Sequence, residues 1–448
     1  MANMWSEAPQ QFFLDVAAFL DGRMQGGEEY RFRLAGESSD FVRFNRSAIR
    51  QSGHVRQIHL TLHLIDGRRH ARSTLALAGA LETDGALLEQ AVRDLRAQLP
   101  DLPEDPHLMM PAEVHSTQHV DGSRLPGTAQ MVDEVLAAAR GFDLVGILAA
   151  GPVFRGFANS SGQRNWHQAA SFNLDWSLYE SRDKAVKAAY AGVDWSSRDF
   201  RERFRSATER LAILRRPPVV IRPGAYRAFL APTALREIVA MLDWGGMSEK
   251  ALRTRQSPLR RMRDEGLLLN PAVTLVENTA DGLAPAFQGD GFIKPGKVVM
   301  LDRGRLVGSL VSPRTGKEYG IATNGADSSE SMSSIDLAGG ELAASRILGE
   351  LDTGLFIGNL WYLNFSDRAN CRITGMTRFA TFWVENGEIK APLEVMRFDD
   401  SLFRLLGPQL EGLTQERELL VDNDTYGGRG TVSARLPGAL VSSFTFVL

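Results

Sequence analysis

Histidine is the residue best suited to acid–base and metal chemistry near neutral pH, and here all eight histidines lie at or before His167. Residues 168–448 therefore contain no imidazole. A zinc site there would have only carboxylates and the single cysteine, Cys371, which is a poor ligand set for that metal. The same absence excludes a Ser-His-Asp or Cys-His arrangement built within that half.

The first half contains two HxxxH spacings, His59/His63 and His115/His119. The first pair falls in an alternating, strand-like run, where residues four apart are about 13 Å from each other and cannot share a metal. The second pair follows Glu113 in AEVHSTQHV and would share a face only in a helix. Its intervening Ser-Thr and the following DGS favour a loop, so we expect no metal at either pair.

Paired acids offer a second kind of chemistry. Asp399 and Asp400 in RFDDSLF, and Asp422 and Asp424 in VDNDTY, have spacings compatible with a glycosidase-type pair or a cation site. Adjacent acids before LFRLL are more often N-caps, with Asp400 or the next residue, Ser401, in that position. A solvated Asn/Asp turn is the better interpretation of the second pair.

Cys371 and the glycine-rich GGRG at 427–430 are further candidates. No histidine is near Cys371 in the sequence, and its strand-like surroundings favour a packed thiol over a nucleophile. The GGRG stretch has no flanking strand and helix to form a phosphate cradle, so turn glycines explain it better.

Length and composition indicate how these residues are organised. A chain of 448 residues exceeds one ordinary hydrophobic core, and the paired prolines in RRPPVV favour a boundary there, giving domains 1–216 and 217–448. The net charge of −3 gives no field that would attract nucleic acid. One cysteine, no export signal and no long apolar run predict a cytoplasmic protein without a membrane span.

Hydrophobic periodicity predicts an α+β fold. The first domain reads as two antiparallel meanders with packed helices, and the second as a mostly antiparallel sheet or partly closed barrel with helices. Asn386-Gly387 is the strongest hairpin signal, because both residues adopt the positive φ angles of a type I′ turn at low cost. Helices are expected over 10–20, 86–99, 129–141, 198–214, 233–242 and 338–350.

Six stretches, in their order along the chain, resemble the TldD/PmbA family. They are FVRFNRSAIRQ (41–51), AYRAFLAPTALREIVAML (225–242), DRGRLVGSLVS (302–312), SIDLAGGELAASRILGELDTGLFIGNL (334–360), GMTRFATFWVENGEI (375–389) and PLEVMRFDDSLFRLL (392–406). The resemblance implies a cytoplasmic metalloprotease complex of TldD-like and TldE-like subunits that matures small modified peptides or degrades short substrates. In the TldD-like subunit, zinc is held by an HExxxH helix and a cysteine near the C-terminus.

The corresponding helix here carries Arg236, Glu237 and Met241, in a register uncertain by about one residue. Glu237 matches the family glutamate, whereas Arg236 and Met241 stand at the histidine positions. Arginine cannot bind zinc and a thioether is a poor zinc ligand, so the motif is a remnant without its metal ligands. A salt-bridged core helix is an equally open interpretation of the Arg236–Glu237 pair.

The resemblance therefore predicts a TldE-like subunit with no cofactor of its own, inactive alone, and paired with a zinc-bearing TldD-like partner around a peptide substrate. Two alternatives stay open. One is a non-catalytic homodimer that binds peptides or acts in assembly. The other is an autonomous hydrolase with a metal in the first domain, starting from His115 and His119.

Overall fold

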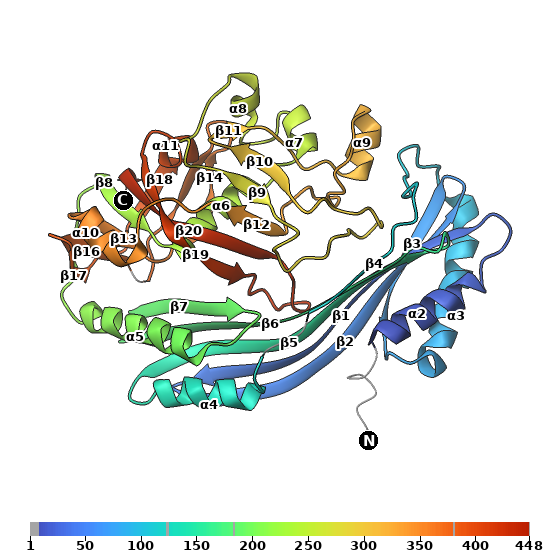
Figure 1. The fold of residues 1–448 in the computed structure, drawn as a ribbon, viewed down its shortest axis with the longest axis horizontal. Coiled ribbons are helices and arrows are strands. Elements are labelled where there is room, and N and C mark those ends of the chain that lie inside the picture. Colours follow the sequence, from blue (N-terminus) through green and yellow to red (C-terminus); the bar gives the residue numbers. More distant parts are fainter. Residues whose placement is uncertain (1–8, 122–124, 182–183, 380, 448) are drawn as a thin grey trace.

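The computed structural model describes residues 9–121, 125–181, 184–379 and 381–447, which form two large sheets with helices against them (Figure 1). Strands of the first sheet come from residues before 193, and those of the second from residues after 223. The sheets thus lie on either side of the predicted 216/217 boundary, which itself stays a prediction. Among the described strands neither sheet closes into a barrel, and the α+β class is confirmed.

The first sheet has seven strands in the order β3-β2-β1-β5-β6, with β4 and β7 pairing with different parts of β6. All of its pairs are antiparallel except β4 with β6. The two predicted meanders are therefore one sheet, joined because β1 pairs with β2 along one edge and with β5 along the other. The strands are β1 (Glu29–Asn45), β2 (Ala48–Asp66), β3 (Arg69–Leu77), β4 (Thr117–Val120), β5 (Asp143–Asn159), β6 (Arg164–Tyr179) and β7 (Ala185–Gly192).

Helices cover this sheet at two ends and confirm the predicted helical segments. Helices α2 (Pro9–Asp21) and α3 (Leu81–Gln98), followed by η1 (Leu99–Asp101), enclose one hydrophobic cluster with β1, β2 and β5. Helices α4 (Thr128–Ala138) and α5 (Ser197–Leu214) build another, which continues into the second sheet through Phe229, Phe356 and Leu440. Because this core is shared, α5 and β7 lie directly beneath the second domain (Figure 1).

The second sheet has thirteen strands, with β20 (Ser433–Phe446) bonded to β8, β12, β18 and β19. Among the strand pairs of the described residues, β12–β20 and β8–β13 are the parallel ones. Its other strands are β8 (Gly224–Leu230), β9 (Leu275–Glu277), β10 (Val298–Asp302), β11 (Arg305–Leu306), β12 (Ser334–Leu337), β13 (Gly354–Ile357), β14 (Trp361–Asp367), β15 (Arg372–Met376), β16 (Thr381–Glu385), β17 (Glu388–Pro392), β18 (Arg397–Ser401) and β19 (Leu410–Val421).

The helices of the second domain are mostly short. They are α6 (Pro232–Asp243), α7 (Glu249–Arg253), α8 (Arg260–Asp264), α9 (Pro313–Tyr319), η2 (Ala344–Arg346), α10 (Ile347–Leu351) and α11 (Leu402–Leu405). Among the described residues, none of the helices is long and apolar enough to cross a bilayer. Asn386 and Gly387 have φ angles of 52° and 73°, which confirms the predicted hairpin between β16 and β17.

The helix expected over 338–350 is wrong in its first part. Residues 338–343 instead run beside β19, where the N–H groups of Gly340 and Leu342 donate to Thr414 and Leu413. A side chain at Gly340 would come within 2.5 Å of the Leu413 carbonyl oxygen, so the glycines permit this close approach. Tertiary hydrogen bonding therefore overrides the helical pattern, and helical structure begins only at Ala344.

Candidate functional site

Helix α6 begins directly after β8 and presents two different faces. Pro232 occupies its first turn, where a missing N–H costs nothing, and the alternation of apolar residues that follows is helical. One face packs into the core of the second domain through Ala234, Leu235, Ile238, Val239, Met241 and Leu242. The opposite face, formed by Thr233, Arg236, Glu237 and Ala240, lines a cleft.

This interdomain cleft has a volume of about 260 Å³ and lies between α6, β7 and the end of β19. Both domains contribute to its walls, as Figure 1 shows for α6 above β7. The remaining lining residues are Asp175, Lys187, Ala188, Ala189, Asn359, Leu420, Val421, Asp422 and Asn423. A second cavity of about 460 Å³ shares Lys187, Ala188, Ala189, Thr233 and Asn359 with it, so the two are contiguous.

Three charged side chains in the cleft, those of Lys187, Arg236 and Glu237, have no hydrogen-bond or ion-pair partner within the described part of the chain. The expected alternative of a salt-bridged core pair is therefore wrong, because both α6 residues face the cleft. Partial desolvation raises the pKa of the Glu237 carboxyl group, while attraction to Arg236 and Lys187 lowers it less. The cleft is thus lined by charged side chains, of which Lys187 and Glu237 are exposed to solvent and Arg236 is half-buried.

The donor set of this cleft does not fit zinc. Arg236 is a permanent cation, and Met241 is only 6% exposed and belongs to the core on the other side of α6. In a regular α-helix, residues five apart are separated by about 140° around the axis, so positions 236 and 241 diverge. No histidine or cysteine lines the cleft, and the described residues contain no group of three metal-binding side chains.

The first histidine pair of the first domain lies on a strand, as predicted, whereas the loop predicted around the second pair gives way to strand β4 at Thr117. His59 and His63 are half-buried residues on β2. His115 lies in a loop and His119 on β4, where its ring stacks against His167 at 4.9 Å. Burial and the neighbouring His119 lower the pKa of His167 to about 4, and the hydrogen bond to the Leu283 carbonyl opposes this shift only in part.

The acidic pairs and the cysteine have structural roles. Asp399 pairs with Arg372, and buried Asp400 accepts hydrogen bonds from the backbone N–H groups of Ser401 and Thr445. Ser401 occupies the N-cap position of α11, but its side chain makes no capping bond.

Asp422 and Asp424 each accept a backbone N–H two residues ahead, which confirms a solvated turn. Cys371 is completely buried, which raises the pKa of its thiol to about 12 and suits a packed residue.

Sequence reasoning missed the role of Arg429, in the middle of the GGRG stretch. Its side chain is 6% exposed and enters the first sheet, where it donates to the carbonyl oxygens of Gly151 and Ser171 at 2.8 and 2.7 Å. Gly428, with φ of 134°, lies against the buried Glu37. The loop between β19 and β20, residues 422–432, is therefore anchored in the other domain, as Figure 1 shows by its descent to β5 and β6.

A serine–histidine–aspartate chain on the exposed face of β1 and β2 was also missed. His54 Nδ1 lies 2.6 Å from Asp40, and its Nε2 lies 3.1 Å from Ser38 Oγ. Arg56 Nε donates to the same Nε2 at 2.9 Å and competes for the lone pair that would accept the serine proton. Cross-strand pairing explains the cluster, which we assign to a polar network of the sheet surface.

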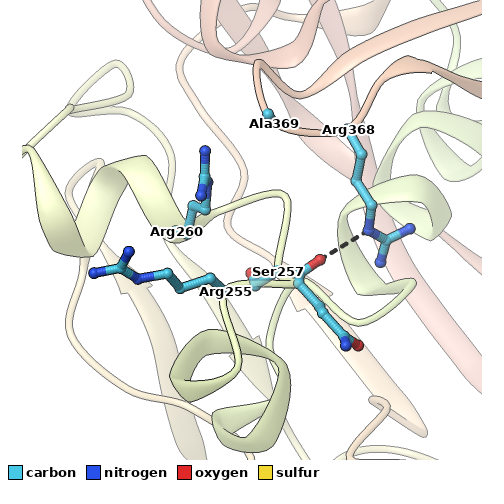
Figure 2. Close-up of a pocket in the computed structure, with 6 residues that line it drawn as sticks. Arg255, Ser257, Arg260, Arg368 and Ala369 are labelled. Atoms are coloured by element: carbon cyan, nitrogen blue, oxygen red, sulfur yellow. Dashed lines mark hydrogen bonds between the residues drawn. The ribbon is translucent and has the colours of Figure 1, made fainter.

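A separate opening of about 470 Å³ is lined by Arg255, Gln256, Ser257, Arg260, Arg368 and Ala369 (Figure 2). Arg368 donates to the Gln256 carbonyl at 2.9 Å and stacks over Phe365, while Arg255 extends away from it. None of these lining residues is a carboxylate, histidine or thiol, so the opening lacks a general acid or base. The interdomain cleft is the better candidate site.

The class of protein that the fold and the site define is an α+β protein of two large sheets with a charged cleft between them, and comparison with known proteins identifies the family. Residues 223–447, half of the chain, match the family model described as the PmbA/TldA metallopeptidase C-terminal domain. The chain therefore belongs to the PmbA/TldD family. No curated protein matches it by sequence.

Three solved structures share the whole fold. TldE from Thermococcus kodakarensis has 14% identity and a TM-score of 0.75, with 98% of this chain and 100% of that chain covered. A candidate modulator of a DNA gyrase from Thermotoga maritima MSB8 has 16% identity and a TM-score of 0.74, with the same coverage. A candidate modulator of DNA gyrase from Bacteroides thetaiotaomicron VPI-5482 has 13% identity and a TM-score of 0.73, with 98% of each chain covered. At these identities the likeness concerns the fold alone.

Proposed function

We propose that this chain is the TldE-like, non-metal subunit of a cytoplasmic TldD/TldE-type peptidase that processes small modified peptides. The observation that carries the proposal is that α6 has two different faces, one toward the cleft and one toward the core. Its cleft face carries Arg236 and Glu237, and Met241 is held in the core, so the helix that resembles the family's metal helix in sequence presents no histidine to the cleft. The family membership and the fold shared with TldE support the same assignment.

In this proposal the chain binds and orients peptide, and a TldD-like partner supplies zinc and cleaves the bond. Glu237 has no metal-bound water to polarise, since no zinc ligand lies beside it. The chain's own contribution is the interdomain cleft, which presents the charged side chains of Lys187, Arg236 and Glu237 to a ligand. The proposal therefore predicts that this chain alone cleaves no peptide and that the pair of chains does.

Co-expression with a subunit that carries HExxxH tests the proposal. We expect the two chains to co-purify, zinc to be bound at one equivalent per pair, and peptide cleavage to require both chains. Glu237→Gln in this chain should leave the cleavage rate within a few-fold, whereas the same change in the partner's motif should abolish it. Stoichiometric zinc on this chain alone, or cleavage by it alone, would refute the assignment.

A further inference from the structure

The opening between the α7–α8 loop and the β14–β15 turn is lined by arginines that have no carboxylate partner. Three cations line it and form no ion pair with a described residue: Arg255, Arg260 and Arg368. The arginines beside them are paired, Arg253 with Glu249 and Arg261 with Glu265. Burial lowers the pKa of the Arg368 guanidinium, as expected for a cation to which no carboxylate is bonded. The opening therefore has a surplus of positive charge.

An aromatic ring extends this positive surface. Trp244, which ends α6, is 56% exposed, although burying so large a ring would be favourable. The Arg368 guanidinium lies over the rings of Trp244 and Phe365, 5.5 and 4.8 Å from their centroids, and donates to the Trp244 carbonyl. These contacts restrain the exposed indole. We call the five residues the arginine–tryptophan patch: Trp244, Arg255, Arg260, Phe365 and Arg368.

Trp244 also connects the patch to the interdomain cleft. Residues four apart lie on the same side of a helix, so Trp244 follows Arg236 and Ala240 in one row along α6. Arg236 and Ala240 both line the cleft. A protein that covers the patch can therefore extend along α6 to the cleft.

The directions of the guanidinium groups indicate what kind of ligand fits the patch. Figure 2 shows Arg255, Arg260 and Arg368 pointing in different directions around the opening. A single small anion cannot contact all three, whereas a segment with several carboxylates can, and each carboxylate can accept two hydrogen bonds from a guanidinium. The net charge of −3 gives no wider positive field for a nucleic acid backbone. An acidic protein segment is the better match.

A second copy of this chain fits the patch poorly. In a two-fold symmetric dimer the same surface occurs on both sides of the contact. The patch contains three arginines and no carboxylate, so symmetric pairing would bring arginines against arginines. Tryptophan and arginine are the residues that most often dominate the binding energy of protein interfaces. The complementary surface therefore belongs to a different protein.

We propose that the arginine–tryptophan patch docks an acidic segment of the partner subunit that carries HExxxH. Carboxylates of that segment pair with Arg255, Arg260 and Arg368, and an apolar side chain packs against Trp244. This inference deepens the proposed function and rests on it for the identity of the partner. It places the contact beside the cleft, at the end of α6.

The test measures the affinity of the full chain for the purified HExxxH subunit by biolayer interferometry, in about 50 mM and about 500 mM sodium chloride. Arg255→Glu/Arg260→Glu should weaken binding at least about tenfold at low salt and much less at high salt, because salt screens exposed charges. Trp244→Ala should weaken binding at least about tenfold at both salt concentrations, since it removes an apolar anchor.

Arg43→Glu/Arg50→Glu is the matched control. These two arginines of the first domain are exposed and form no ion pair with a described residue, so the change in charge is the same at a different place. The control should bind the partner as the unaltered chain does. Thermal unfolding checks the fold of every variant, and the Arg255/Arg260 double variant should unfold at an unaltered temperature because neither side chain bonds to a described residue.

Each outcome decides the inference. If the Arg255/Arg260 double variant binds the partner as tightly as the unaltered chain, the inference is overturned and the proposed function stands. If the unaltered chain forms no complex with the HExxxH subunit, the proposed function is refuted and the inference with it. Sedimentation of the chain alone as a dimer that the double variant loses would assign the patch to a second copy. Binding of a single-stranded oligonucleotide that the double variant loses would assign it to nucleic acid, and either result overturns the inference.

Discussion

Arg429 offers the sharpest test of how the two domains are held together. Its guanidinium donates four hydrogen bonds inside the first sheet, to the Gly151 carbonyl (2.8 Å), the Ser171 carbonyl and hydroxyl (2.7 and 2.8 Å) and the Ser39 hydroxyl (3.3 Å). The buried Glu37 carboxylate attracts both Arg429 and Arg155. Arg429→Met keeps an unbranched apolar stem and removes every donor of the guanidinium.

The expected loss follows from this burial. Removing one member of a buried charge cluster costs about 3 to 5 kcal/mol, because the carbonyl and hydroxyl acceptors lose their donor and the buried Glu37 loses a nearby positive charge. The cost is smaller if the loop 422–432 detaches from the sheet and lets water in, so part of the effect should be local. We therefore expect a lower unfolding midpoint in denaturant together with faster exchange of the amides in this loop.

The assay combines urea unfolding with hydrogen–deuterium exchange of the 422–432 segment. Arg429→Lys should have an intermediate effect, since it keeps the charge and loses the planar fork. Arg255→Met is the control, because this exposed side chain has no hydrogen bond among the described residues. If Arg429→Met leaves both the midpoint and the loop exchange unchanged, the anchoring role is refuted.

Three further predictions concern buried groups. Met241→Lys should prevent stable folding, because it buries an unpaired charge in the core, whereas Met241→Leu should cost less than about 1.5 kcal/mol; unfolding curves of the purified variants decide this. Burial and the nearby Glu277 raise the pKa of Asp243 from 3.8 to about 7, so its protonated form favours the folded state. That contribution is complete below about pH 4 and is lost as the pH rises to 7; Asp243→Asn should flatten the dependence of the unfolding temperature on pH between 4 and 8, and an unaltered slope would contradict it. Cys371 should react with Ellman's reagent only after denaturation, and rapid labelling of the native chain would show the thiol to be accessible.

Much of the fold could be predicted because local patterns and tertiary packing agree. The alternation of Ile58, Leu60, Leu62 and Leu64 predicts a strand with one buried face, and all four are at most 1% exposed. The helix predicted at 338–343 does not form, because hydrogen bonds to β19 override the helical pattern of the segment. The strand patterns did not predict that the two meanders join into one sheet. The joining depends on which edge of β1 pairs with β5, and the pattern of a strand does not specify its partner.

The sequence by itself showed which chemistry the second domain lacks. Residues 168–448 contain no histidine, so in any fold they cannot supply the imidazole ligands of a zinc site of the family's type. It also placed Arg236, Glu237 and Met241 on one helix. Only the tertiary structure decided that the first two line an interdomain cleft and the third is in the core. That outcome depends on which side of α6 packs on β20 and which faces β7 across the cleft. The same holds for Arg429, whose partners are more than 250 residues away in the sequence and become neighbours only when the domains pack.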